Sequence, residues 1–341
     1  MIGGEFSISP LTILETKESN NSNKKRIEDN CYYYSSGRGA LFQILKYLKN
    51  HFDIKEILLP NYLCNTVLVP ITKIGLSYSF YPLDESLEIE QNVFFKLYSK
   101  SSVVLLVNYF GLQELSNQIK FIRDFAPNAI IIEDDVMAYF EFKKELNGVD
   151  FKYTSLRKTF AIPDGGIVKT NHKLPVVDKN NTYGQYKATA AMMKSMRETF
   201  FDDSVYLDIS KIGNTLINDE LDFGMSSIAM KLYKEVDEYL VIKRRKENAT
   251  FLSSELRKIG ISPILPLSMD KVPLFLPVRL NNRDEIRNKL FKNQIFCPIH
   301  WNDCCISKKY NSNIPNTELS LVIDQRYEEK DMAKIISLIT Q

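Results

Sequence analysis

A lysine that precedes a glycine pair, with carboxylates upstream, is the part of this sequence best suited to covalent chemistry. Lys158 is followed by Gly165-Gly166, and a hydrophobic run upstream ends in Glu133-Asp134. A lysine amine can form a Schiff base with the aldehyde of pyridoxal phosphate. A carboxylate opposite it keeps the pyridine nitrogen protonated, so that the ring can act as an electron sink. We therefore predict that Lys158 and Asp134 are catalytic and that pyridoxal 5'-phosphate is the cofactor.

A glycine-rich turn before a helical pattern could hold the phosphate of such a cofactor. Ser36, Gly37, Arg38 and Gly39 precede or open a segment over residues 39–51 in which apolar residues recur at helical spacing. Glycine lets backbone N–H groups approach a phosphate, and the positive end of the helix dipole favours the anion. The alternative is an ordinary helix cap, because serine and glycine are common at helix starts. We predict all four residues as cofactor-binding.

Each of these features also has an ordinary interpretation. Glu133, Asp134 and Asp135 could form a solvated acidic turn after a buried strand, and at most one of them can face a cofactor ring. Lys158 could be a surface lysine, and Gly165-Gly166 could be a hairpin turn. The order in which the features follow one another along the chain favours a common site over these separate interpretations.

The elements that must position these residues alternate between strands and helices in the first half of the chain. The predicted strands are 56–59, 77–81, 103–107 and 129–132, and the predicted helices are 39–51, 63–74 and 113–125. Near-continuous apolar strands between helices are typical of an α/β fold with a mostly parallel central sheet covered by helices. In such a sheet ligands bind beyond the carboxyl ends of the strands, where Asp134 is expected.

A smaller α+β unit is predicted in the C-terminal part. A long helical pattern covers 226–259, strands are predicted at 272–280 and 295–299, and helices at 283–291 and 328–339. We expect residues 1–225 to form an N-terminal segment with the large cofactor-binding domain, and residues 226–341 to form the small C-terminal domain. Residues 176–208 are polar and rich in methionine, and the sequence assigns them no role.

The motifs resemble those of the DegT/DnrJ/EryC1/StrS aminotransferases, which have the aspartate-aminotransferase (type I) fold of pyridoxal phosphate enzymes. Residues 36–41 are similar to the family's S-G-T-A-A-L phosphate turn, 59–62 to its V-P-S-F and 107–111 to its V-H-x-F-G. Residues 132–138 are similar to I-E-D-A-A-Q-A, which implies that Asp134 faces the pyridine nitrogen. Lys158 keeps the family's spacing to the glycine pair. The resemblance extends from about Cys31 to the C-terminus.

The resemblance implies an aminotransferase that takes an amino group from an amino acid donor, by analogy L-glutamate. The acceptor would be a keto group of a nucleotide-linked deoxysugar destined for a surface polysaccharide. The resemblance also implies a homodimer with active sites at the subunit interface. Two alternatives stay open: another pyridoxal-phosphate-dependent enzyme of the same fold, such as a lyase or dehydratase, and a non-catalytic degenerate paralogue.

The chain departs from the family pattern close to the expected cofactor. Tyr153 stands where the family has a phosphate-binding serine, and Ser155, in an S-x-x-K arrangement with Lys158, is the predicted replacement. Cys64 stands where an aromatic residue commonly stacks on the cofactor. That difference leaves Tyr62 as the predicted stacking residue.

Other positions concern the substrate and the family's remaining contacts. His300-Trp301 resembles the family's H-Y segment and is predicted to bind substrate, although Trp301, the only tryptophan, could instead anchor two domains. Arg326 could bind a carboxylate bidentately or form a structural ion pair. Met137 replaces a glutamine near the ring hydroxyl. Asp222 replaces part of an asparagine-containing segment and receives no role, because a carboxylate repels a phosphate.

Composition and charge limit the class of protein. The 341 residues include 44 Lys and Arg against 42 Asp and Glu, so the net charge of +2 gives no bias toward nucleic acid or an anionic membrane. Five cysteines without metal-type spacing and only three histidines argue against a metal centre. Adjacent Cys304-Cys305 could be reactive, but scattered thiols in a reduced compartment are favoured. Residues 1–14 show no secretory pattern and the apolar runs are too short to span a bilayer, so we expect a cytoplasmic protein.

Overall fold

The computed structural model describes residues 1–15, 30–98, 103–197, 202–301 and 313–340. Cys304 and Cys305 lie outside the described residues. Within the described residues, no helix is both long enough and apolar enough to cross a membrane. The same ranges contain no group of three or more His, Cys, Asp or Glu side chains arranged to hold a metal ion.

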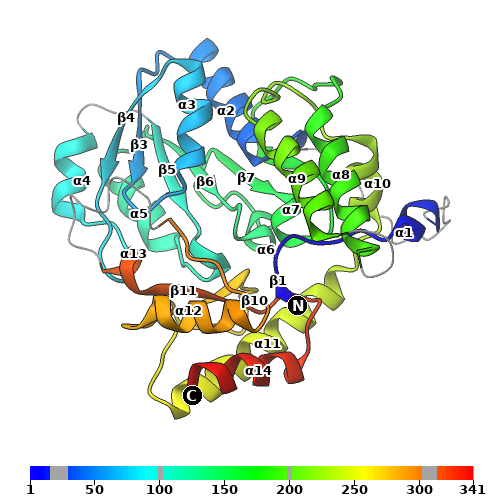
Figure 1. The fold of residues 1–341 in the computed structure, drawn as a ribbon. Coiled ribbons are helices and arrows are strands. Elements are labelled where there is room, and N and C mark those ends of the chain that lie inside the picture. The colour runs from blue at the N-terminus through cyan, green and yellow to red at the C-terminus, as the bar shows by residue number, and fades with distance from the viewer. Residues whose placement is uncertain (16–29, 99–102, 198–201, 302–312, 341) are drawn as a thin grey trace.

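A seven-stranded sheet forms the centre of the larger part of the molecule (Figure 1). Its strand order is β2-β8-β7-β6-β5-β3-β4. The five strands from β7 to β4 pair in parallel, and only β8 runs antiparallel to both of its neighbours. The strands are β2 (Cys31–Tyr34), β3 (Glu56–Pro60), β4 (Ser77–Tyr81), β5 (Val103–Val107), β6 (Ile130–Asp134), β7 (Phe151–Ser155) and β8 (Gly166–Thr170). The expectation of a mostly parallel sheet is therefore confirmed.

Helices cover this sheet, and α2 shows why the sequence folds this way. Ser36 caps α2 by accepting a hydrogen bond from Gly39 N, and the buried face of the helix carries apolar residues such as Ile44 and Leu48. The helix predicted over 63–74 starts later, because Pro70 cannot sit deeper in a helix, and it ends at Gly75 as expected. The helices of this part are α2 (Gly37–His51), α3 (Leu68–Ile74), α4 (Gln91–Tyr98), α5 (Ser116–Phe125), α6 (Tyr139–Phe142), α7 (Leu156–Thr159), α8 (Thr182–Ser195), α9 (Asp203–Leu216) and α10 (Ser227–Lys234).

The C-terminal elements form a second core beside the large sheet. The long helix predicted over 226–259 is two helices, because Asp237 accepts a hydrogen bond from Leu240 N and starts a new one. A two-stranded antiparallel sheet pairs β9 with β11. The elements are α11 (Glu238–Lys258), β9 (Phe275–Arg279), α12 (Arg283–Lys292), β10 (Ile295–Phe296), α13 (Ile314–Thr317), β11 (Glu318–Val322) and α14 (Glu329–Thr340).

The N-terminal segment joins the C-terminal elements. β1 (Ile2–Gly3) pairs in parallel with β10, and Figure 1 draws the N-terminus beside that strand. Ile2 belongs to the hydrophobic cluster that includes Leu252 and Leu276, whereas Ala229 of α10 packs in a cluster with Leu156 of α7. The packing thus crosses residue 225 in both directions. The division into 1–225 and 226–341 stays a prediction.

Candidate active site

Most of the predicted site residues surround one cavity of about 190 Å³, named here the Asp134 cavity. It lies where β5, β6 and β7 end at their carboxyl side and where α2 begins. The predicted residues that line it are Ser36, Gly37, Arg38, Asp134, Ser155, Lys158, His300 and Trp301. Of the remaining predicted residues, Gly39 and Tyr62 do not line it. The structure therefore brings together segments that are far apart in the sequence.

Lys158 enters the cavity from α7, which follows β7 directly. The Lys158 side chain is accessible from the cavity, and the surrounding protein encloses the rest of it. This enclosure, together with the positive charge of Arg157, lowers the pKa of the Lys158 amine below its usual value of 10.5. A lower pKa increases the fraction of neutral amine, which is the nucleophilic form.

Asp134 ends β6 and lies beside Tyr153 of β7 across the parallel strand pair. The Tyr153 hydroxyl donates a hydrogen bond to Asp134 Oδ2 (2.5 Å), and Val136 N donates one to Oδ1 (2.9 Å). Burial raises the pKa of Asp134 from 3.8 to about 6, although these hydrogen bonds and the charge of Lys158 favour the anion. Asp134 is therefore an oriented carboxylate that is ionised at neutral pH.

The two carboxylates next to Asp134 do not line the Asp134 cavity. Glu133 forms a buried ion pair with Lys152 of β7 (3.4 Å). Asp135 is fully buried, and this burial and the nearby Glu133 raise the pKa of its carboxyl well above the usual range. Of the three neighbouring acids, only Asp134 faces the site.

The turn before α2 and the end of β7 meet at the opposite wall of the cavity. Ser36, Gly37 and Arg38 present the N-terminus of α2, and Ser155 packs against them. A Cβ atom at Gly37 would lie 3.1 Å from Ser155 Cβ, so glycine allows the two segments to approach. Arg38 donates a hydrogen bond to the side chain of Asn218 and has no described acid as an ion-pair partner. Backbone N–H groups, hydroxyls and a guanidinium on one wall suit a phosphate.

Gly39 lies one residue deeper in α2 and supports the packing of the turn. A Cβ atom there would lie 2.9 Å from Ser35 Oγ and 3.0 Å from Leu221 O. Its own N–H donates to Ser36 Oγ (3.0 Å). Glycine at position 39 therefore allows the turn to lie close to Leu221, and the contact of Gly39 with the cofactor stays a prediction.

The glycine pair after Lys158 docks the lysine segment onto the same turn. Gly165 has a φ of +111°, and its N–H donates to Ser35 O (2.7 Å). A Cβ atom at Gly166 would lie 2.1 Å from Ser36 O. The pair is thus needed for a close backbone approach, which a simple hairpin turn would not require.

Gly166→Ala is expected to destabilise the protein by about 3 kcal/mol, because the new methyl group would displace the backbone of the turn. The measurement is chemical denaturation of the cofactor-free protein. Gly260→Ala is the control: Gly260 has a φ of +77° but no described atom within 4 Å of an added Cβ, so the expected loss is about 1 kcal/mol. Equal losses in the two variants would contradict the close approach.

Tyr62, the predicted stacking residue, does not line the Asp134 cavity, and its role stays a prediction. Tyr62 packs its ring against Tyr109 (5.5 Å between centroids) and Trp301 (4.8 Å), and its hydroxyl donates to His300 O (3.1 Å). Cys64, two residues on, lines the Asp134 cavity in its place. The contacts with Tyr109, Trp301 and the His300 carbonyl therefore fix the Tyr62 side chain outside the lining of the cavity.

The segment His300-Trp301 forms another part of the wall. Trp301 has a φ of +57°, an uncommon backbone conformation for a residue with a side chain. His300 N donates to Glu318 Oε2 (2.8 Å), and His300 Nδ1 lies 2.7 Å from Ser320 Oγ. β11 therefore fixes the backbone and the ring of His300 at the site.

Two side chains with open interpretations are engaged elsewhere. Arg326 forms a bidentate ion pair with Asp324 (2.8 and 2.7 Å), so the structural interpretation holds. Asp222 accepts hydrogen bonds from Gln43 (2.6 Å) and Lys46 (2.9 Å) on α2, and it does not line the cavity.

A buried carboxylate anchors the loop that leads into the glycine pair. Asp164 is fully buried and accepts hydrogen bonds from Ser226 N (2.9 Å), from the Ser226 hydroxyl and from Asn181 Nδ2 (3.4 Å). Burial raises the pKa of Asp164 from 3.8 to about 6. Folding therefore favours the protonated form of Asp164. This carboxyl stabilises the protein below pH 4, where it is protonated, and this contribution is lost as the pH rises to 6 and the carboxyl ionises.

Asp164→Asn removes this ionisation and nearly preserves the shape of the side chain. The free energy of unfolding of the variant, relative to the unaltered protein, is expected to rise by about 2 kcal/mol between pH 4 and pH 6. Denaturation curves at several pH values check this difference, in which the equal contribution of Asp134 cancels. Parallel pH profiles for the two proteins would contradict the assignment.

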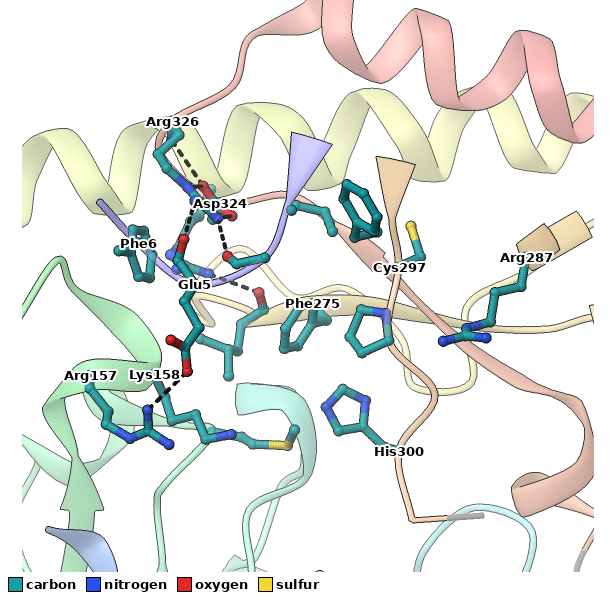
Figure 2. Close-up of a pocket in the computed structure, with 18 of the residues that line it drawn as sticks. Glu5, Phe6, Arg157, Lys158, Phe275, Arg287, Cys297, His300, Asp324 and Arg326 are labelled. Atoms are coloured by element: carbon teal, nitrogen blue, oxygen red, sulfur yellow. Dashed lines mark hydrogen bonds and ion pairs between the residues drawn. The ribbon is translucent and has the colours of Figure 1, made fainter. Parts of the chain in front are cut away.

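A second cavity of about 410 Å³, named here the arginine cavity, lies between the N-terminal segment and the C-terminal elements (Figure 2). It shares Met137, Arg157, Lys158 and His300 with the Asp134 cavity. Glu5 enters it from the N-terminal segment, and its carboxylate binds Lys187 (2.7 Å) and lies 3.4 Å from Arg157. These cations lower the pKa of Glu5 to about 2 against the effect of burial.

Several of these contributions were missed in the sequence. The contact between Tyr153 and Asp134 follows from the register of β6 and β7, but β7 itself was not predicted, because Lys152 and Thr154 interrupt its apolar pattern. Arg157 stands next to Lys158 and could have been noticed for its charge. Glu5 gives no local signal, since it reaches the site only through the pairing of β1 with β10.

Comparison with known proteins adds evidence on the fold. A scan against protein-family models found no match, and neither did a search of curated proteins. Among solved structures, the sugar aminotransferase CalS13 from Micromonospora echinospora is similar with a TM-score of 0.67 and 14% identity, covering 99% of each chain. A DegT DnrJ EryC1 StrS aminotransferase from Brucella abortus gives 0.62 and 16%, covering 98% of this chain and 91% of that one. S. venezuelae DesV, solved in complex with a ketimine intermediate, gives 0.64 and 16%, covering 99% and 90%. The chain therefore has the fold of these proteins, and the expected type I fold class is confirmed.

Proposed function

We propose that this chain is a pyridoxal-5'-phosphate-dependent aminotransferase of the DegT/DnrJ/EryC1/StrS type, which moves an amino group from an amino acid to a keto group. The observation that carries the proposal is that Lys158 and Asp134 enter one cavity whose far wall is the N-terminus of α2. The names of CalS13 and of the Brucella abortus protein support amino transfer. The sequence resemblance supports the same chemistry independently of any fold comparison.

The residues of the Asp134 cavity fit this cofactor. Ser36, Gly37, Arg38 and Ser155 would hold its phosphate, and Asp134 would face its ring nitrogen. Gly37 supports the fit, because a side chain there would fill the space between the turn and Ser155. When bound, the cofactor supplies an aldehyde that takes up the amino group and a ring that withdraws electrons from the reacting carbon.

Lys158 and Asp134 would have complementary roles, since Lys158 would transfer a proton and Asp134 would hold one in place. Lys158 Nζ, with its lowered pKa, would take the proton from the α-carbon of the donor and donate it at the carbon that carried the cofactor's aldehyde, acting first as base and then as acid. The anionic Asp134 would hold a proton at the ring nitrogen, since an opposing carboxylate favours the charged form of that nitrogen. The Tyr153 hydroxyl would orient the carboxylate.

The substrates follow from the resemblance. We propose L-glutamate as donor and a nucleotide-linked keto deoxysugar of surface polysaccharide synthesis as acceptor, with His300 and Trp301 on the substrate side of the site. The resemblance also supports a homodimer, the scattered cysteines favour a cytoplasmic protein, and the pattern of strands and helices supports the domains 1–225 and 226–341. Nothing in the net charge of +2 favours nucleic acid or a membrane as a partner.

A half-reaction tests the proposal directly. Protein reconstituted with pyridoxal phosphate is mixed with L-glutamate, and the loss of its visible absorption band is followed together with the formation of 2-oxoglutarate. We expect both in equal amounts, and we expect the band to return on addition of a keto substrate. A cofactor-loaded protein that converts no amino acid would instead favour a lyase, a dehydratase or a non-catalytic role.

A further inference from the structure

The arginine cavity has more positively charged than negatively charged side chains in its lining, even when Lys158 is left out. Its lining includes Arg157, Arg245, Arg287 and Arg326, against the acids Glu5 and Asp324. A cavity lined in this way attracts anions, but only those guanidinium groups that lack partners can bind one strongly. The partners of each arginine therefore decide which of them can act on a ligand.

Three of the four guanidinium groups are engaged within the described parts of the chain. Arg326 is held by Asp324, and Arg157 faces Glu5 (3.4 Å). Arg245 is almost fully buried and donates to Leu274 O (2.8 Å) and to the side chain of Gln325 (3.0 Å), as well as to other backbone carbonyls. These three arginines therefore connect parts of the protein.

Arg287 differs from the other three. It projects from α12 of the C-terminal elements, and its Nε is shielded from solvent without a hydrogen-bond partner among the described residues. Asp284, on the same helix, is bound by Arg283 (2.9 Å), and the Arg287 guanidinium lies 5.8 Å from the centroid of the Phe291 ring. Figure 2 shows its guanidinium turned into the cavity, toward the side on which His300 lies. A shielded donor without a partner lowers stability, so a guanidinium in this state is suited to an incoming anion.

The surroundings of Arg287 describe the rest of such a ligand. Phe275, Phe296 and Pro298 line the same cavity with apolar surface, and Lys158 lies at its opposite side from Arg287 in Figure 2. A molecule that reacts at Lys158 and also reaches Arg287 would have its reactive group at one end, an apolar stretch, and an anionic group at the other end.

We propose that Arg287 is the specificity-determining residue that binds the anionic group of a substrate, a carboxylate or a phosphate, across the cavity from Lys158. The inference rests on the proposed function, because it assigns the reacting end of the substrate to Lys158. The carboxylate would come from the side chain of a dicarboxylic donor, and the phosphate from a nucleotide-linked acceptor. Both are planar or forked acceptors for the two parallel N–H groups of a guanidinium.

The test measures binding without any chemical step. The full-length protein, loaded with pyridoxal phosphate, is titrated calorimetrically with glutarate and, separately, with UDP. Arg287→Met removes the charge at similar length, and Arg287→Lys keeps the charge without the bidentate geometry. Lys292→Met, on an exposed position of the same helix, is the matched control. Because neither ligand can react, this result is separate from the half-reaction with L-glutamate that tests the proposed function.

We expect Arg287→Met to weaken one of the two ligands by about tenfold or more, and Arg287→Lys to weaken it less. Weaker glutarate binding identifies the donor carboxylate as the ligand, and weaker UDP binding identifies the acceptor phosphate. Unchanged binding of both ligands in both Arg287 variants would overturn the inference, and so would an equal loss in Lys292→Met. In the half-reaction, a carboxylate ligand also predicts that Arg287→Met slows L-glutamate and leaves L-alanine unchanged.

Discussion

Lys158→Ala is expected to abolish the visible absorption band of the reconstituted protein and to lower turnover by at least about 10⁴-fold. The variant loses both the amine that binds the cofactor aldehyde and the group that carries the proton, and each loss alone is large. No other described lysine lines the Asp134 cavity, so no neighbour can take over. The two measurements are the visible absorbance after reconstitution and the half-reaction with L-glutamate.

Lys173→Ala is the control for this result, because Lys173 is an exposed lysine outside the site. It should keep the band and the turnover. A Lys158→Ala protein that retains the band would show that another amine binds the cofactor, and the assignment of Lys158 would then be wrong. Normal denaturation of the variant would exclude unfolding as the cause of its inactivity.

Asp134→Asn is expected to leave cofactor binding largely intact and to lower turnover by about 10²- to 10³-fold. Asparagine fills the same space and can still accept the hydrogen bond from Val136, but it carries no charge to hold a proton at the ring nitrogen. The measurements are the amount of cofactor retained after dialysis and the rate of the half-reaction. Turnover within a few-fold of the unaltered protein would refute the role of Asp134.

Tyr153→Phe separates the charge of Asp134 from its orientation. The Tyr153 hydroxyl favours the anion, so its removal raises the pKa of Asp134 above the value of about 6. Asp134 acts in its ionised form, which exists above that pKa. The acid limb of the pH–rate profile should therefore move to higher pH in the variant, while the rate at its plateau falls less than in Asp134→Asn. A profile that keeps its acid limb would place the relevant ionisation elsewhere.

The type of chemistry and the class of fold could be read from local segments. Lys158 with its glycine pair, Asp134 at a strand end and the turn at Ser36 each lie within a few residues of a recognisable element. In a parallel sheet the carboxyl ends of neighbouring strands meet at one edge, so local order along the chain already implied that these side chains converge. The apolar strands 103–107 and 129–132 were found for the same reason, since a strand buried on both faces has a continuous apolar pattern.

Strands with buried polar residues were missed. β7 contains the buried Lys152, whose charge is compensated by Glu133 on the adjacent strand and by a hydrogen bond to Glu141 O (3.2 Å). A pattern read along one segment cannot detect a partner on another. The contact between Tyr153 and Asp134 depends on the same strand pairing.

Tertiary structure alone decided which of several chemically similar side chains remain available to a ligand. Arg326 looked able to bind a carboxylate, but Asp324 occupies it, whereas Arg287 Nε has no hydrogen-bond partner among the described residues and the residue lines the arginine cavity. Tyr62 looked able to stack on the cofactor, but Tyr109 and Trp301 hold it outside the Asp134 cavity. The physical reason is the same in each case. The residue type fixes what a side chain can do. Whether its donors, acceptors or ring face remain available to a ligand depends on partners from segments distant in the chain, and only the folded packing brings these partners into contact.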